Sequence, residues 1–316
     1  MSNIYTSVFS GYNYYEPIEN NIEELLHCQS KEKFNVVYKV LPDFPEHEWY
    51  KYISNPPLTF RVRWPIDIIK TQKENEYGLV LKNIIPPKYE KLKNLVYDSY
   101  ELDHRKESIR ELTINIIDTL ILLEKSGYIY NTYDSEKIYF HPQTYDLIFD
   151  FSTSIIRNDC NTVFFSFLYN DVSSDFMPPW VNIDESNKNY MTNLNINSSN
   201  YSLAALLFRL MIGRLPYQGR LSDGIGDLMV DDRDNEPLIH KEMVKLYLKH
   251  PIFIFDKKNK INAIGDFGEE KKYIERWESL PFEVKKIFES VFISDNNENC
   301  SSSVITPNDW KKVLYK

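Results

Sequence analysis

The sequence predicts an α+β fold with two parts: a small, strand-rich part over residues 1–83 and a larger, mainly helical part over residues 84–316. Two observations support this division. Short runs of β-branched and aromatic residues dominate the first part, whereas apolar residues at helical spacing dominate the second. The string Ile84-Ile-Pro-Pro87 stands between them and interrupts both patterns. We therefore expect two lobes that meet near this string.

Strand-like runs and one short helix are expected in the first part. Residues 34–40, 59–64 and 77–81 are rich in β-branched and aromatic side chains, which are typical of strands. Residues 46–53 begin with acidic side chains, which the helix dipole favours in a first turn, so we expect a helix there. Residues 1–30 are polar, rich in tyrosine and only weakly periodic. They predict no strand.

A long amphipathic helix and a β-hairpin are expected next. Residues 107–125 place apolar side chains on one helical face, and Gly127 supplies the C-terminal stop. Two short apolar runs, at residues 137–140 and 147–151, are separated by a turn-forming string, which indicates a hairpin. The polar stretch 157–200 lacks periodicity and predicts a large loop.

Further helices are expected towards the end of the sequence. Residues 200–212 are largely apolar, with Asn200 suited to the N-cap and Gly213 to the C-terminal stop. Residues 281–293 and 307–315 have amphipathic spacing. The second part is therefore expected to be mainly helical.

Composition and charge argue against several classes of function. The net charge of −9 and the pI near 5.3 argue against nucleic acid or an anionic membrane as the main partner. Cys28, Cys160 and Cys300 are odd in number and widely spaced, so they predict neither a disulfide framework nor a zinc site. No signal-peptide pattern opens the sequence, and no run approaches the roughly 18 apolar residues of a bilayer span. We expect a cytoplasmic protein.

Several strings, in this order along the chain, are similar to motifs of the protein kinase family. Val36-Val-Tyr-Lys39 resembles the strand that carries the nucleotide-binding lysine. Leu147-Ile-Phe-Asp-Phe-Ser152 resembles the strand that leads into the Asp-Phe-Gly motif, with Ser152 in place of glycine. Residues 200–204 and 211–217 resemble the family's buried helix and its ending. The alternative is an unrelated α+β domain with chance matches.

A second group of strings resembles the bacterial serine/threonine-kinase-like branch of this family. These strings are Arg63-Trp-Pro-Ile-Asp67, residues 251–256, residues 277–281 and the helix with Asp309-Trp310. The resemblance implies a two-lobed protein-kinase-like fold, with a small β-rich N-lobe and a larger, mainly α-helical C-lobe. It covers roughly residues 30–316.

The resemblance implies a nucleotide site around Lys39. Glu48, on the following helix, is the expected carboxylate partner of this lysine, with Glu46 as the second choice. An ordinary surface ion pair is the other interpretation of Lys39 and Glu48.

The glycine-rich loop that would cover the phosphates is missing. No glycine occurs between Gly11 and Gly78, and residues 18–24 contain three acidic side chains that would repel a triphosphate. We expect residues 18–31 to form a short helix or folded loop that fills part of the nucleotide space. ATP and Mg²⁺ would be cofactors only if nucleotide binding is retained, and we expect none.

The catalytic loop is degenerate. The family pattern His-Arg-Asp-Leu-x-x-x-x-Asn places Tyr130 at the histidine, Thr132 at the catalytic aspartate and Lys137 at the metal-binding asparagine. Threonine cannot accept a hydroxyl proton as a carboxylate does, and lysine repels a magnesium ion. Asp134 is a substitute for the missing carboxylate if the register shifts; the other interpretation is that Asp134 opens a turn before the hairpin.

Asp150 corresponds to the metal-binding aspartate, and it is the one metal ligand that the sequence retains. Lys39 or Lys137 could neutralise it, and a structural acceptor role is the other interpretation. Elsewhere, Trp180 replaces the glutamate of a family ion pair, and residues 303–306 stand where its arginine would be. Asn200 replaces the aspartate of the buried helix.

The sequence therefore predicts a pseudokinase: a catalytically inactive, kinase-like protein that acts as a regulatory or scaffolding signalling module on a protein partner. The alternative is an active ATP-dependent serine/threonine protein kinase with a non-standard catalytic loop. That enzyme would use Lys39, Asp150 and Asp134. The sequence indicates no particular partner, pathway or oligomeric state.

Overall fold

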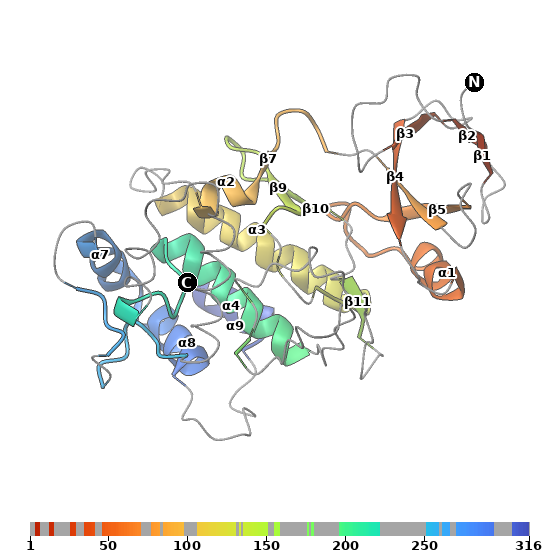
Figure 1. Cartoon of the computed structure of the whole chain (residues 1–316). Helices are drawn as coiled ribbons and strands as arrows, with labels where there is room; N and C mark the ends of the chain where they lie inside the picture. Colours follow the sequence, from red (N-terminus) through yellow and green to blue (C-terminus); the bar gives the residue numbers. More distant parts are fainter. Residues whose placement is uncertain are drawn as a thin grey trace. The chain divides into compact units, whose positions relative to one another are not determined.

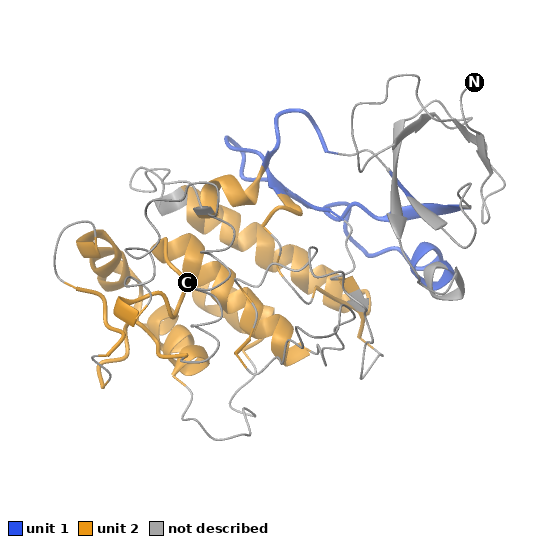
Figure 2. Ribbon diagram, viewed as in Figure 1, with its two compact units in different colours: residues 1–90, 139–152 blue, residues 91–138, 153–316 orange. Residues whose placement is uncertain are grey.

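The computed structural model describes residues 4–6, 13–15, 26–29, 35–41, 46–70, 77–82, 85–97, 106–130, 133, 135–150, 155–158, 176, 178–179, 196–221, 251–258, 261–265, 270–293 and 305–315. The chain divides into two compact units (Figure 2). The first contains residues 1–90 and 139–152, and the second contains residues 91–138 and 153–316. The predicted lobe boundary at residues 83 and 84 stays a prediction.

A six-stranded sheet lies in the first unit (Figure 1). Its order is β1-β2-β3-β4-β6-β5, and all five neighbouring pairs are antiparallel. The strands are β1 (Ile4–Thr6), β2 (Asn13–Tyr15), β3 (Leu26–Gln29), β4 (Asn35–Leu41), β5 (Pro65–Lys70) and β6 (Tyr77–Lys82).

Strands β4 and β6 and helix α1 (Glu46–Ser54) confirm three predicted elements. β4 is an unbroken run of β-branched, aromatic and aliphatic residues apart from Asn35 and Lys39, and it pairs with β3 on one side and β6 on the other. Helix α1 contacts β5. Tyr52 of this helix is buried near Trp64, whose Nε1 donates to the Tyr52 carbonyl oxygen at 2.9 Å.

The first thirty residues contain strands that the sequence pattern did not predict. β3 pairs with β4 in register from Leu26–Tyr38 to Gln29–Asn35. The expectation of a helix or folded loop over residues 18–31 is therefore wrong for these four residues, whose backbone groups find partners in a neighbouring strand. Residues 18–25 lie outside the described residues.

The strand expected over residues 59–64 is also wrong in its extent. β5 begins only at Pro65, and within the preceding segment Val62 makes a single parallel bridge to Phe149. The Arg63 amide donates to the Phe149 carbonyl and the Phe149 amide donates to the Arg61 carbonyl, both at 2.8 Å. The segment therefore pairs with the distant strand that ends at Phe149, which no local pattern could reveal.

The predicted hairpin is present as β9 (Ile138–Phe140) and β10 (Leu147–Phe149), which are neighbours in a three-stranded sheet of order β10-β9-β7. β7 is the two-residue strand Glu90–Lys91. The turn is closed by hydrogen bonds from the His141 amide to Asp146 O and from the Tyr145 amide to His141 O, both 2.8 Å. Tyr145 has a φ of 56°, in the left-handed region.

The second unit is mainly helical. Its helices are α2 (Leu92–Tyr97), α3 (Lys106–Lys125), α4 (Ile196–Ile212), α7 (Lys271–Ser279), α8 (Phe282–Phe292) and α9 (Pro307–Leu314). A two-stranded sheet pairs β8 (Tyr128–Tyr130) with β11 (Ile155–Arg157). Helices α3, α8 and α9 confirm predictions, while α2, α7 and both strands were not predicted. None of the helices within the described residues combines the length and apolar character of a membrane span.

Helix α4 is the most buried helix of this unit, and α3 lies beside both α4 and α9 (Figure 1). Asn200 was expected at the start of α4, but the helix begins at Ile196, so the N-cap prediction is wrong. The run of small and apolar residues is long enough to place Asn200 inside the buried helix. Phe208 of α4 is surrounded by the rings of Phe253, Trp277, Phe288 and Phe292, at centroid distances of 5.2–6.2 Å.

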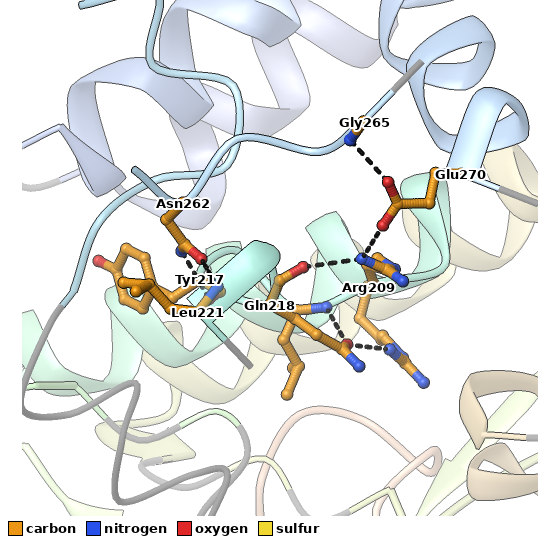
Figure 3. Close-up of polar contacts among 9 residues, drawn as sticks. Arg209, Tyr217, Gln218, Leu221, Asn262, Gly265 and Glu270 are labelled. Carbon is orange, nitrogen blue, oxygen red and sulfur yellow. Dashed lines mark hydrogen bonds and ion pairs between the residues drawn. The ribbon is translucent and has the colours of Figure 1, made fainter. Parts of the chain in front are cut away.

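Asn262 joins two segments that lie far apart in the sequence, as Figure 3 shows. Its side chain is 1% exposed; Nδ2 donates to Tyr217 O at 2.9 Å and Ile252 O at 2.7 Å, and Oδ1 accepts from the Leu221 amide at 3.1 Å. A Cβ at Gly219 would overlap the Asn262 carbonyl, so the glycine allows this close approach. The amide therefore ties residues 217–221 to residues 252–262.

Replacing Asn262 with alanine should lower the free energy of unfolding by about 2–3 kcal/mol, because three backbone groups lose their buried partner at once. Urea denaturation measures this as a lower midpoint at an unchanged slope. Asn55→Ala is the matched control: its Nδ2 donates to Lys51 O at an exposed site, so its loss should cost less than about 0.5 kcal/mol. Equal effects of the two substitutions would contradict this interpretation.

Candidate functional site

The structure places Lys39 and Glu48 on the elements that the sequence predicted for them. Lys39 lies in β4 opposite Leu79 of β6, and Glu48 lies in the first turn of α1. Their side chains, and that of Glu46, lie outside the described part of the chain. The Lys39–Glu48 pair therefore stays a prediction.

Asp150 follows β10 directly, and its carboxylate is held by an arginine that sequence reasoning missed. Arg63 Nη1 donates to Asp150 Oδ1 at 3.2 Å. The Arg63 side chain is 3% exposed and that of Asp150 is 15% exposed. Lys39 and Lys137 were the expected partners. The side chain of Lys39 lies outside the described part of the chain, and the ion pair that the structure describes is with Arg63. The string with Arg63 was noticed in the sequence, but nothing in it indicates a partner 87 residues away.

A second arginine repeats this arrangement at the other end of β10. Arg61 Nε lies 3.1 Å from Asp146 Oδ1, and the Tyr89 hydroxyl donates to Asp146 Oδ2 at 3.0 Å. Partial burial and the Asp146 carboxylate raise the pKa of the Tyr89 hydroxyl. Arg61 is thus paired with the aspartate that precedes β10, and Arg63 is paired with the aspartate that follows it.

The residues that resemble the start of a kinase catalytic loop lie in the core of the second unit. Tyr130 ends β8 with 1% of its side chain exposed, and its ring lies 5.1 Å from that of the equally buried Tyr133. Ser199 Oγ, on α4, donates to the Tyr130 carbonyl oxygen at 2.7 Å. Burial is also the main cause that raises the pKa of Tyr133 well above its usual value. These side chains serve packing.

Thr132 and Asp134, the residues expected at the catalytic aspartate and as its substitute, lie outside the described residues. Their predicted roles therefore stay predictions. The loop resumes at Ser135, which is 2% exposed and whose carbonyl accepts from the Lys93 amide at 3.0 Å.

Lys137 immediately precedes β9 and is half-buried. Its neighbour Glu136 is bound by Lys93 at 3.0 Å and by Lys91 at 3.5 Å. The hydrogen bond from Lys93 is the largest cause that lowers the pKa of Glu136. This side of the loop is therefore held by lysines from the segment that begins α2.

Asn200 lies inside α4, 4% exposed, next to the serine that holds Tyr130. Within the described part of the chain, neither its Oδ1 nor its Nδ2 has a hydrogen-bond partner. Of the other predicted departures, Trp180 lies outside the described residues, while Thr306 has a structural role. Its hydroxyl accepts from the Asp309 amide and caps α9 in a capping box.

The residues at the two positions that the resemblance assigns to metal ligands are poorly suited to a magnesium ion. Magnesium is usually bound through one or two carboxylates and several waters, and Asp150 Oδ1 already accepts a hydrogen bond from a buried guanidinium. The second position carries the cationic side chain of Lys137. Among the described residues, no group of three or more histidine, cysteine, aspartate or glutamate side chains could hold a metal ion.

Comparison with known proteins supports the fold. No protein-family model matches the chain, and no curated protein matches it in sequence. In structure it is similar to vaccinia related kinase 3, with a TM-score of 0.50 and 14% sequence identity, over 99% of this chain and 91% of that chain. At this identity the likeness shows the fold alone: the chain has an α+β, two-lobed, protein-kinase-like fold with a small β-rich lobe and a larger helical one.

Replacing Ser199 with alanine should destabilise the protein by about 1–2 kcal/mol, because the buried carbonyl of Tyr130 loses its donor. Urea unfolding measures the change. Ser290→Ala is the control, because Ser290 is exposed and, within the described residues, its Oγ donates to Ile287 O of the same helix. If Ser199→Ala is as mild as the control, α4 does not hold the loop.

Stability should fall above about pH 10, and Tyr133 should cause part of the fall. The folded state raises the pKa of Tyr133, so its contribution is complete below the unfolded value and is lost as the pH rises past it. Each such group adds a slope of about 1.4 kcal/mol per pH unit. Urea unfolding at several pH values in this range gives the free energy of unfolding as a function of pH. This free energy should fall less steeply with pH for Tyr133→Phe than for the natural chain, and equal pH dependence would refute the assignment.

Proposed function

We propose that this chain is a catalytically inactive, protein-kinase-like protein that acts as a regulatory or scaffolding module on a protein partner. The observation that carries the proposal is the burial of the catalytic-loop region. Tyr130, Tyr133 and Ser135 are all 1–2% exposed, and Ser199 Oγ on α4 donates to the Tyr130 carbonyl oxygen. A catalytic loop must present a carboxylate to a substrate hydroxyl, whereas the described part of this loop presents core side chains.

The charges at the nucleotide and metal positions support the same conclusion. Phosphoryl transfer is catalysed mainly by placing positive charge, usually metal ions held by an aspartate and an asparagine, around the phosphates. Here the aspartate is paired with Arg63, and the asparagine position holds Lys137. The glycine-rich loop is also absent from the sequence between Gly11 and Gly78. Several groups that act as one unit are therefore altered together.

Exposed apolar side chains support a protein partner. Leu58 and Phe60 are 72% and 82% exposed, although they flank the buried Thr59. Hydrogen bonds to the Thr59 hydroxyl and to Phe149 anchor the backbone that follows them. An anchored backbone loses little conformational freedom when it binds, which favours contact with another protein. A two-lobed fold without catalysis can act in this way by biasing the conformational equilibrium of what it binds.

The purified chain should transfer no phosphate from Mg²⁺-ATP to itself or to general kinase substrates above the background of Asp150→Asn. The reason is the joint alteration of the catalytic-loop, metal and phosphate-loop positions. Thr132→Asp should not restore activity, because the missing groups are non-additive. Radiolabel transfer is the measurement. Transfer by the natural chain that disappears in Asp150→Asn would favour the alternative, an active serine/threonine kinase with a non-standard loop.

A further inference from the structure

We infer that Arg63 takes the electrostatic place of the metal ion at Asp150, so that this carboxylate is one half of a structural ion pair. The inference rests on the proposed function in one respect only, the correspondence of Asp150 to the metal-binding aspartate of kinases. The geometry of the pair is independent of that correspondence.

The backbone fixes both partners. Residues 61–63 run parallel to the end of β10, held by the reciprocal bonds between Arg63 N and Phe149 O and between Phe149 N and Arg61 O. Asp150 is the next residue after Phe149, so this register brings its side chain within reach of Arg63. The backbone pairing therefore accounts for the proximity of the Arg63 and Asp150 side chains.

Burial makes the loss of one partner of this pair costly. The Arg63 side chain is 3% exposed, so its charge has no access to bulk water and needs a carboxylate. A divalent cation on Asp150 would have to share the carboxylate with a fixed guanidinium, and the two positive charges would repel each other. The arginine thus supplies permanently the positive charge that a kinase takes from its metal ion.

The pair of Arg61 and Asp146 offers an internal comparison. It joins the same two segments at the other end of β10, but its side chains are 25% and 37% exposed, and Asp146 does not correspond to a metal ligand. Solvent weakens such a pair, so its loss should matter less. Matching substitutions at Asp146 and Asp150 therefore separate the burial of a pair from the mere presence of one.

The test compares the melting temperatures of the natural chain, Asp150→Asn and Asp146→Asn. We expect Asp150→Asn to lower the melting temperature by roughly 5 °C or more, because it removes the carboxylate that faces a buried guanidinium. Asp146→Asn should lower it by less than half as much. A carboxylate poised for a metal behaves in the opposite way: without the metal, removing its charge leaves stability unchanged or raises it.

Millimolar Mn²⁺ provides the second arm. Any shift caused by Mn²⁺ should be the same in the natural chain and in Asp150→Asn. The double variant Arg63→Gln with Asp150→Asn should melt above Asp150→Asn, because the buried positive charge is then removed together with the negative one. The inference is overturned if the melting temperature of Asp150→Asn equals or exceeds that of the natural chain. It is also overturned if Mn²⁺ raises the melting temperature of the natural chain but not that of Asp150→Asn. Neither outcome depends on phosphotransfer, so the inference about Arg63 and Asp150 can fail while the proposed function stands.

Discussion

The second unit depends on the burial of α4. Most residues of this helix are buried, and five aromatic rings from three later segments lie around Phe208. Arg209 on the same helix donates to Val96 O at 2.9 Å, which ties α2 to it. Ser199 holds Tyr130 O from its first turns. The helix at the centre of the core therefore also fixes the position of Tyr130, where the loop begins. A catalytic side chain is not needed to hold this position.

In the first unit, Asp150 is paired with a buried arginine. Arg63 and Asp150 are brought together by the pairing of residues 61–63 with β10, and both charges are largely buried. In a kinase the metal-binding aspartate acts by holding a metal ion that bridges the phosphates of the nucleotide. Here its counter-charge is covalently part of the chain. An aspartate in the expected place is thus no sign of activity, because its partner decides its chemistry.

Local pattern predicted the elements whose structure is set locally. Helices α3, α8 and α9 have clear amphipathic spacing, and β4 is a β-branched run, so their prediction from sequence succeeded. The errors involve contacts between residues far apart in the sequence. β3 is extended because β4 pairs with it, and residues 61–63 pair with β10 and not with a strand of the six-stranded sheet. Arg63 was missed for the same reason, since its partner lies 87 residues away. The degenerate loop positions stay predictions, because Thr132 and Asp134 lie outside the described residues.

The most direct measurement is a thermal-shift titration with ATP, with magnesium and with a chelator in its place. A ligand at a hundred times its dissociation constant stabilises the folded state by about 2.7 kcal/mol, which moves the melting temperature of a protein by some degrees. Because Asp150 is already paired with Arg63, the account predicts that magnesium adds nothing to any shift that ATP produces. A shift of several degrees that appears only with magnesium would contradict it.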